Sequence, residues 1–179
     1  MRKPSAAPLV MPYPREMQLA EGSVGVRAVA IRVDGPVARR AARVLKRELK
    51  TLGLPVADGG YPVSLVRLEQ TGLDDEMYSL EVGKRGAVIG AATYAGLYYG
   101  VQTLAQLLAW AGTSWTDQSC PGNGGRSRMS RPTRLPLCSI LDYPLKPIRG
   151  IHTYLPAREN LPFFKRFIEW LGRHKINTV

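Results

Sequence analysis

The sequence predicts an α+β fold in which a small antiparallel sheet carries two helices on one face and is followed by a further strand and helix. Short alternating stretches between residues 23 and 91 are typical of strands, and Gly83 to Gly86 is a hairpin turn between two of them. Two longer stretches, 36–52 and 93–112, repeat their apolar residues with helical spacing.

The first half of the chain is taken in order. Residues 1–8 are expected to be disordered, and two prolines keep 9–17 extended. Residues 23–33 alternate as two short strands or one bent strand, and 63–68 follow as another. The helix over 36–52 sets an apolar stripe against six basic residues. These are Arg39, Arg40, Arg43, Lys46, Arg47 and Lys50.

Strands over 78–82 and 87–91 form the hairpin, and the helix over 93–112 follows it. Thr93 is a good N-cap and Gly112 suits a left-handed stop. The helix is apolar nearly all round, which indicates burial on more than one side. It could span a membrane, form the core of one domain, or lie between its own sheet and a second domain. Its polar and glycine residues argue against the bilayer.

After the helix, residues 113–132 are rich in Gly, Ser and Arg and are expected to form an exposed, mobile loop. A strand over 135–141 returns to the sheet, and 142–147 form a linker. Another strand is predicted over 148–156, and 175–179 look like the start of one more.

Between these last two segments, Asn160 and Pro162 predict a helix start. The inward face of that helix is expected from Phe163, Phe164, Phe167, Ile168 and Leu171. A strand, a helix and part of a strand do not close a core, so this is one unit of something larger.

The formal net charge of +11 raises the possibility of nucleic-acid binding. The basic clusters are not interleaved with aromatic residues, and no helix-turn-helix or zinc-finger pattern occurs. Charge runs of this kind are usually solvated faces, so no nucleic-acid partner is expected. The chain has only two histidines, and Cys120 and Cys138 do not have the spacing of a metal site. No metal site and no cofactor are therefore expected. Two unpaired thiols are favoured over a disulfide.

Three sequence words occur in order: Gly-Leu-Tyr-Tyr-Gly-Val-Gln-Thr-Leu-Ala-Gln-Leu-Leu from residue 96, Ile-Leu-Asp-Tyr-Pro from 140, and Ile-Arg-Gly-Ile from 148. Together they resemble glycoside hydrolase family 20, the β-N-acetylhexosaminidases. The resemblance implies a non-catalytic α/β domain over 9–145, then the first unit of an incomplete (β/α)8 barrel over 146–179. It also favours the reading in which the helix over 93–112 is wedged between a sheet and a barrel, with an exposed apolar side where the barrel is missing.

The resemblance further implies hydrolysis of terminal N-acetylhexosamine residues, with the substrate's own N-acetyl group as nucleophile. The acidic pair of the family lies on a later strand, so no catalytic residue is assigned and this stretch alone is expected to be inactive. Arg149 matches the family's substrate-binding arginine, with an alternative structural role in pairing with Asp142 or a carboxylate on the barrel floor. His152 and Tyr154 are candidates for lining the substrate cleft.

Two alternatives remain beside this hypothesis. One is another barrel glycosidase of the O-GlcNAcase or α-glucuronidase type, and the other is a standalone basic module that binds carbohydrate or nucleic acid. The expected partner is a carbohydrate, with no membrane association. Arg2 and Lys3 lead into Pro and Ser and not into an apolar segment, so a signal peptide is not visible and a cytoplasmic location is favoured.

Overall fold

The computed structural model describes residue 8 and residues 10–69, 75–112 and 133–179. The predicted disordered N-terminus and the predicted loop over 113–132 lie almost entirely outside these residues. The elements follow in the order β1 (Glu16–Val26), β2 (Val29–Val33), α1 (Gly35–Thr51), β3 (Tyr61–Arg67), β4 (Tyr78–Gly83), β5 (Gly86–Ala91), α2 (Tyr94–Gly112), β6 (Thr133–Asp142) and α3 (Leu161–Arg173).

The six strands form one sheet in the order β1-β6-β4-β5-β3-β2. The α+β class is confirmed, but the sheet is mixed and the prediction of an antiparallel sheet is wrong. β2 pairs with β3, and β3 with β5, in parallel, whereas β4 and β6 make antiparallel pairs. The cause is α1, which carries the chain back across the sheet so that β3 runs in the same direction as β2.

The edge strand β1 begins at Glu16, earlier than the alternating pattern indicates. It pairs with β6, and the register shifts between Leu19 and Ser23. Gly22 lies in this interruption with φ 100°, a left-handed conformation that costs glycine little. The shift changes which side chains face the core, and this hides the first half of the strand from an analysis of alternation.

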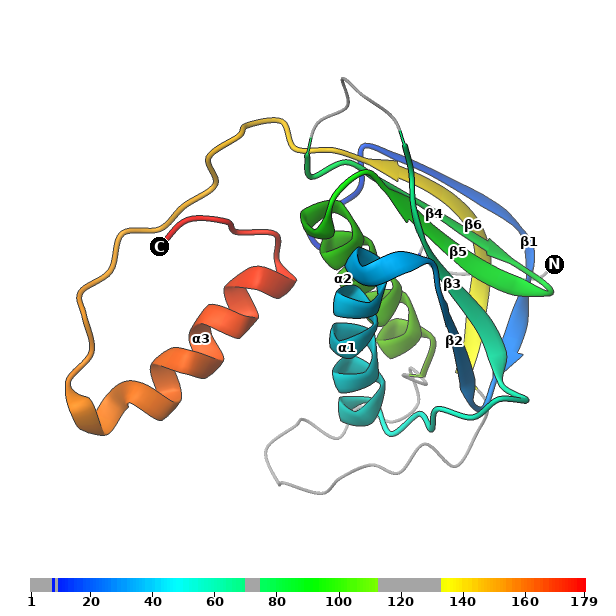
Figure 1. Cartoon of the computed structure of the whole chain (residues 1–179), viewed down its shortest axis with the longest axis horizontal. Helices are drawn as coiled ribbons and strands as arrows, with labels where there is room; N and C mark the ends of the chain where they lie inside the picture. The colour runs from blue at the N-terminus through cyan, green and yellow to red at the C-terminus, as the bar shows by residue number, and fades with distance from the viewer. Residues whose placement is uncertain (1–7, 9, 70–74, 113–132) are drawn as a thin grey trace, which may run out of the picture.

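Helices α1 and α2 lie side by side on the same face of the sheet, as predicted (Figure 1). The predicted N-cap of α2 is confirmed, because Gly96 N donates to Thr93 Oγ1 at 3.2 Å. A Cβ atom on Gly100 would lie 2.5 Å from Ile89 Cγ2, so the helix approaches β5 more closely than any other residue would allow. The core of the molecule therefore lies between α2, α1 and the sheet.

Helix α2 is buried or half-buried along its described length, which confirms the prediction that little of it faces solvent. The prediction that this helix has an exposed apolar side is wrong. Its far side is covered by Met11, whose backbone pairs with the Gln106 side chain at 2.7 and 2.9 Å, and by the end of α3, where Gln106 also donates to Arg173 O. Figure 1 shows α1 and α2 between the sheet and the C-terminal segment.

The C-terminal segment does not join the sheet. The strand predicted over 148–156 does not form, and a single parallel bridge between Gly150 and Thr178 takes its place. The predicted helix does form as α3, although Asn160 makes no side-chain cap. Of its predicted inward face only Leu171 is buried, and Phe163 is 63% exposed. A strand forms only where a neighbouring strand offers backbone groups for pairing, and the described residues supply no such neighbour here beyond the bridge to Thr178.

None of the described helices is both long and apolar enough to cross a bilayer.

Candidate functional site

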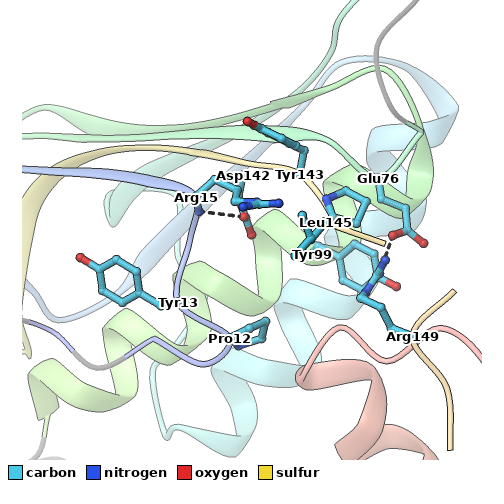
Figure 2. Close-up of a pocket in the computed structure, with 10 residues that line it drawn as sticks. Pro12, Tyr13, Arg15, Glu76, Tyr99, Asp142, Tyr143, Leu145 and Arg149 are labelled. Atoms are coloured by element: carbon cyan, nitrogen blue, oxygen red, sulfur yellow. Dashed lines mark hydrogen bonds and ion pairs between the residues drawn. The ribbon is translucent and has the colours of Figure 1, made fainter. Parts of the chain in front are cut away.

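The site lies where the N-terminal segment, β6 and the linker after it meet the C-terminal segment (Figure 2). An open pocket of about 290 Å³ occupies this position. Its walls carry three tyrosines, two arginines and two carboxylates, a mixture suited to a polar, ring-shaped ligand. The lining residues are Pro12, Tyr13, Arg15, Glu76, Tyr99, Asp142, Tyr143, Pro144, Leu145 and Arg149.

Arg149 forms one wall of this pocket, and its guanidinium is fixed by three protein acceptors. Nε donates to Lys175 O and one terminal nitrogen donates to Lys146 O, both at 2.8 Å. The other terminal nitrogen forms an ion pair with Glu76, and Figure 2 shows the two side chains pointing toward each other. At least three of the five N–H groups of Arg149 are therefore used within the protein.

Asn177 holds the backbone around Arg149 in place. Its Oδ1 accepts from Arg149 N at 2.9 Å, while Nδ2 donates to Pro147 O at 2.7 Å and to a Glu76 carboxylate oxygen at 3.0 Å. One amide side chain thus joins the linker, the Arg149 segment and the loop before β4. This arrangement positions Arg149 relative to the small sheet.

The ring of Tyr99, on α2, packs against the same guanidinium, with Arg149 Cζ 5.8 Å from the ring centroid. Burial raises the pKa of the Tyr99 hydroxyl, and the Glu76 carboxylate raises it further while Arg149 opposes the shift. Tyr99 therefore stays a neutral hydroxyl that can donate a hydrogen bond in the pocket.

A second, buried cluster lies behind the pocket and is centred on Asp142. Lys175 Nζ lies 2.5 Å from Asp142 Oδ2 and 2.9 Å from the Tyr78 hydroxyl. Tyr78 also lies 2.6 Å from Thr103 Oγ1 and donates to Asp142 at 3.1 Å, and Arg15 N donates to the other Asp142 oxygen. Asp142 therefore has a structural role in this cluster, and its cation is Lys175 and not Arg149.

The two pKa shifts in this cluster have one main cause. Burial lowers the pKa of the Lys175 ammonium, and the Asp142 carboxylate opposes that change. Burial and then Asp142 raise the pKa of Tyr78 well above its usual value. Lys175 has φ 60°, which is uncommon for a residue with a side chain, and its buried contacts hold it there.

The other two candidate residues lie outside the pocket. His152 and Tyr154 are exposed, Tyr154 to 87%, and their rings contact each other edge to face with centroids 6.0 Å apart. The structure therefore brings Arg149 into the pocket and leaves His152 and Tyr154 on the surface beyond it.

Sequence reasoning missed Glu76, Tyr99, Lys175 and Asn177. Glu76 lies outside every predicted element and Lys175 lies in the segment predicted to start a strand, and nothing in the local sequence of either residue shows which distant residue it contacts. Two sequence signals pointed to this region, the Asp-x-Pro motif at Asp142 and the Arg-Gly motif at Arg149.

The two carboxylates of the pocket already have partners within the protein. Both of its carboxylates are engaged by cations, Glu76 by Arg149 and Asp142 by Lys175. In the described part of the chain, no three His, Cys, Asp or Glu side chains gather in a way that could hold a metal ion.

The comparison with family models now decides the family. The model described as "Glycosyl hydrolase family 20, domain 2" matches residues 7–143, which is most of the chain. The chain belongs to glycosyl hydrolase family 20. The matched residues include the whole of the small sheet and its two helices. A comparison with curated protein sequences gives no match.

Solved structures of family 20 enzymes agree. The N-acetyl-β-hexosaminidase of Streptomyces plicatus is 28% identical with a TM-score of 0.70, covering 98% of this chain and 34% of the enzyme. The β-N-acetylhexosaminidase of Streptomyces coelicolor A3(2) is 25% identical with a TM-score of 0.66, covering 94% of this chain and 33% of the enzyme.

An exo-β-N-acetylglucosaminidase from Vibrio harveyi shares the fold at 21% identity, with a TM-score of 0.69 and coverage of 94% and 24%. The chain therefore spans about a quarter to a third of the length of these family 20 relatives.

Proposed function

We propose that this chain is the N-terminal part of a glycoside hydrolase that removes terminal N-acetylhexosamine residues. The observation that carries the proposal is the family 20 match over 7–143, together with the likeness to the Streptomyces plicatus N-acetyl-β-hexosaminidase. The proposed reaction is a retaining hydrolysis in which the substrate's own N-acetyl group attacks the anomeric carbon. The acid that protonates the leaving oxygen would come from a barrel strand after Val179.

In this proposal the small domain is not catalytic. Its role is to brace the first barrel unit through the two polar clusters described above. Asp142 on β6 holds Lys175, and Glu76 before β4 holds Arg149, so the unit that bears the candidate substrate residues is tied to the sheet at two points. A barrel strand that carries a sugar-binding residue must be held to within a fraction of an ångström for binding to be productive.

Arg149 would bind sugar hydroxyls with the N–H groups that its three protein contacts leave over. Glu76 and the two carbonyl groups would then hold the guanidinium plane at a fixed angle, which is what recognition of two adjacent hydroxyls requires. His152 and Tyr154 follow on the same segment, and we include them as residues that line the far side of the substrate cleft.

The test compares two proteins on a fluorogenic N-acetylglucosaminide. The 179-residue chain is expected to give no turnover, whereas the protein encoded by the whole reading frame is expected to hydrolyse this substrate and to leave the corresponding glucoside intact, because a glucoside lacks the nucleophile. Turnover by the 179-residue chain would refute the bracing role. Equal cleavage of both substrates by the longer protein would refute the substrate-assisted reaction.

Arg149→Lys in the longer protein tests the site. The lysine keeps the charge but loses the planar fork, so KM is expected to rise at least tenfold, which corresponds to about 1.4 kcal/mol. Lys146→Gln serves as the matched control, because its side chain is exposed and makes no ion pair with the described residues. An unchanged KM in Arg149→Lys would show that this arginine is structural.

A further inference from the structure

The solvent-facing side of α1 carries only positive charge. Its six basic side chains are all exposed, and the single carboxylate of the helix, Glu48, is 5% exposed. Glu48 is turned inward, where it contacts Arg47 and Arg173. The outer surface of α1 therefore has no negative charge of its own.

Four of the six cations form what we call the basic stripe, which consists of Arg39, Arg43, Lys46 and Lys50. Their spacing of three or four residues places them along one side of the helix. At a rise of 1.5 Å per residue, the stripe is about 16 Å long. None of the four side chains makes a hydrogen bond or an ion pair with any residue that the structure describes.

The two remaining cations of α1 already have partners. Arg40 stacks on Tyr94, with Cζ 4.3 Å from the ring centroid. Arg47 pairs with Glu48 at 3.5 Å and with Glu169 on α3 at 3.4 Å. The structure thus separates cations that hold the helices together from cations that serve no internal contact.

Like charges three and four residues apart oppose helix formation, so the basic stripe works against the helix that bears it. Between residues 39 and 50, every exposed position of α1 is an arginine or a lysine, so no uncharged or acidic side chain interrupts the row. A rigid row of cations without internal counter-charges is complementary to an external row of anions.

We propose that the basic stripe binds an acidic polysaccharide, a linear glycan that carries carboxylate or sulfate groups along its length. The stripe would lie along the glycan, with each cation near a successive anionic group. A carbohydrate-active family makes a glycan the fitting polymer, and the stripe would hold the protein on the acidic glycan from which sugars are removed. To that extent the inference rests on the proposed function.

The composition of the stripe argues against other polyanions. It contains no aromatic side chain on which a nucleic-acid base could stack, and no Asn or Gln that could read a base edge. The apolar side of α1 is buried against the sheet and α2, so the helix has no apolar face to insert into a bilayer.

The stripe is also separate from the pocket. No residue of α1 lines the pocket that contains Arg149. Binding of an acidic polymer to α1 can therefore be measured on the 179-residue chain, whether or not the longer protein hydrolyses an N-acetylhexosaminide, and a failure of one proposal does not imply a failure of the other.

The experiment compares the unmodified protein with two variants, all tested as the full 179-residue chain. The stripe variant is Arg39→Gln, Arg43→Gln, Lys46→Gln and Lys50→Gln. The control variant is Arg27→Gln, Lys84→Gln, Arg85→Gln and Lys146→Gln, which removes the same number of exposed arginines and lysines from other surfaces. Circular dichroism confirms that each is folded, and glutamine preserves helix propensity in α1.

Binding is titrated with polygalacturonate, with neutral dextran as the uncharged polymer, over a series of salt concentrations. Each lost contact is expected to weaken binding about fivefold, so the stripe variant should bind several-hundredfold more weakly than the unmodified chain at low salt. The control variant is expected to stay within about threefold, and binding of the unmodified chain should fall as salt rises.

Three outcomes would overturn the proposal. The first is no measurable binding of polygalacturonate by the unmodified chain. The second is an equal loss in the stripe and control variants, which would reduce the effect to net charge. The third is tighter binding to duplex DNA or to anionic lipid vesicles than to polygalacturonate at the same salt concentration, which would identify a different polyanion as the partner.

Discussion

The Nζ atom of Lys175 lies 2.5 Å from Asp142 Oδ2, and both side chains are buried between β6 and the turn after α3. This ion pair joins the small sheet to the C-terminal segment. The hydroxyl of Tyr78 contacts both groups, so a residue from β4 completes the joint. This buried pair is one of the contacts that fix how the C-terminal segment sits against the small sheet.

The first prediction concerns that pair. Lys175→Met removes the cation and leaves the Asp142 carboxylate buried beside two hydrogen-bond donors only. We expect the free energy of unfolding to fall by about 3 kcal/mol, as is typical when one partner of a buried ion pair is removed. Urea denaturation at neutral pH measures the change.

Two controls accompany Lys175→Met. Lys165→Met removes an exposed lysine from α3 and is expected to change stability by less than about 0.5 kcal/mol. The double variant Lys175→Met with Asp142→Asn is expected to be less destabilised than the sum of the two single variants. Strict additivity would show that the two groups do not stabilise each other.

The second prediction concerns the contact of α2 with the sheet. Gly100→Ala would place a Cβ 2.5 Å from Ile89 Cγ2 and 3.1 Å from Tyr78 Cδ2. Alanine favours helices by about 1 kcal/mol over glycine, yet we expect a net destabilisation of about 1–3 kcal/mol because the helix must move away from the sheet. Gly59→Ala, where no atom lies within 4 Å of the new Cβ, is the control. A stabilised Gly100→Ala protein would contradict the packing.

The third prediction concerns the unpaired thiol of Cys138. It is buried on β6, and burial raises its pKa to about 11, with a further contribution from Glu81. In a Cys120→Ser protein, so that Cys138 is the only thiol, we expect no reaction with a thiol-specific disulfide reagent at pH 8 and one equivalent after denaturation. Rapid reaction of the folded protein would show that β6 opens easily. Cys120 itself lies outside the described residues.

The fourth prediction concerns alkaline pH. Burial raises the pKa of Tyr61 to about 12, with a smaller contribution from Cys138, and its hydroxyl donates to Gly83 O at 2.7 Å. Between pH 10 and 12 the folded protein keeps a proton that the unfolded chain loses, so stability falls as pH rises through this window. Tyr61→Phe is expected to lower stability at pH 8 by the lost hydrogen bond and to reduce the further loss between pH 10 and 12.

Unfolding measured at closely spaced pH values tests this. Tyr154→Phe is the control, because that ring is 87% exposed. If the two phenylalanine variants lose stability with the same slope above pH 10, the burial of the Tyr61 hydroxyl does not control alkaline stability.

The helices were predictable because each signal is local. Thr93 caps α2 with its own hydroxyl, and the apolar stripe of α1 repeats within the helix itself. The direction of β3 could not be predicted, because the alternation of side chains in a strand is the same whether its neighbour runs parallel or antiparallel. The same limit applies to β1, whose register shift at Gly22 reverses the alternation from which strands are inferred.

The candidate site shows the same division. Arg149 was predicted because it belongs to a sequence motif of the family, and the structure places it in the pocket. Its carboxylate partner was expected to be Asp142 or a barrel residue, and Glu76 takes that place, across more than seventy residues of chain. The domain boundary after residue 145 and the roles of His152 and Tyr154 remain predictions.

By itself, the sequence determined the class of the fold, the two helices on the sheet, the family, and the presence of a row of cations on α1. These depend on the periodicity of apolar residues and on short sequence motifs, which are properties of neighbouring residues. Only the tertiary structure decided that the sheet is mixed, that Lys175 meets Asp142, that Arg149 meets Glu76, and that the basic stripe has no internal counter-charge. Each of these depends on which distant groups the folded chain brings within a few ångströms, the distance at which hydrogen bonds and close ion pairs form.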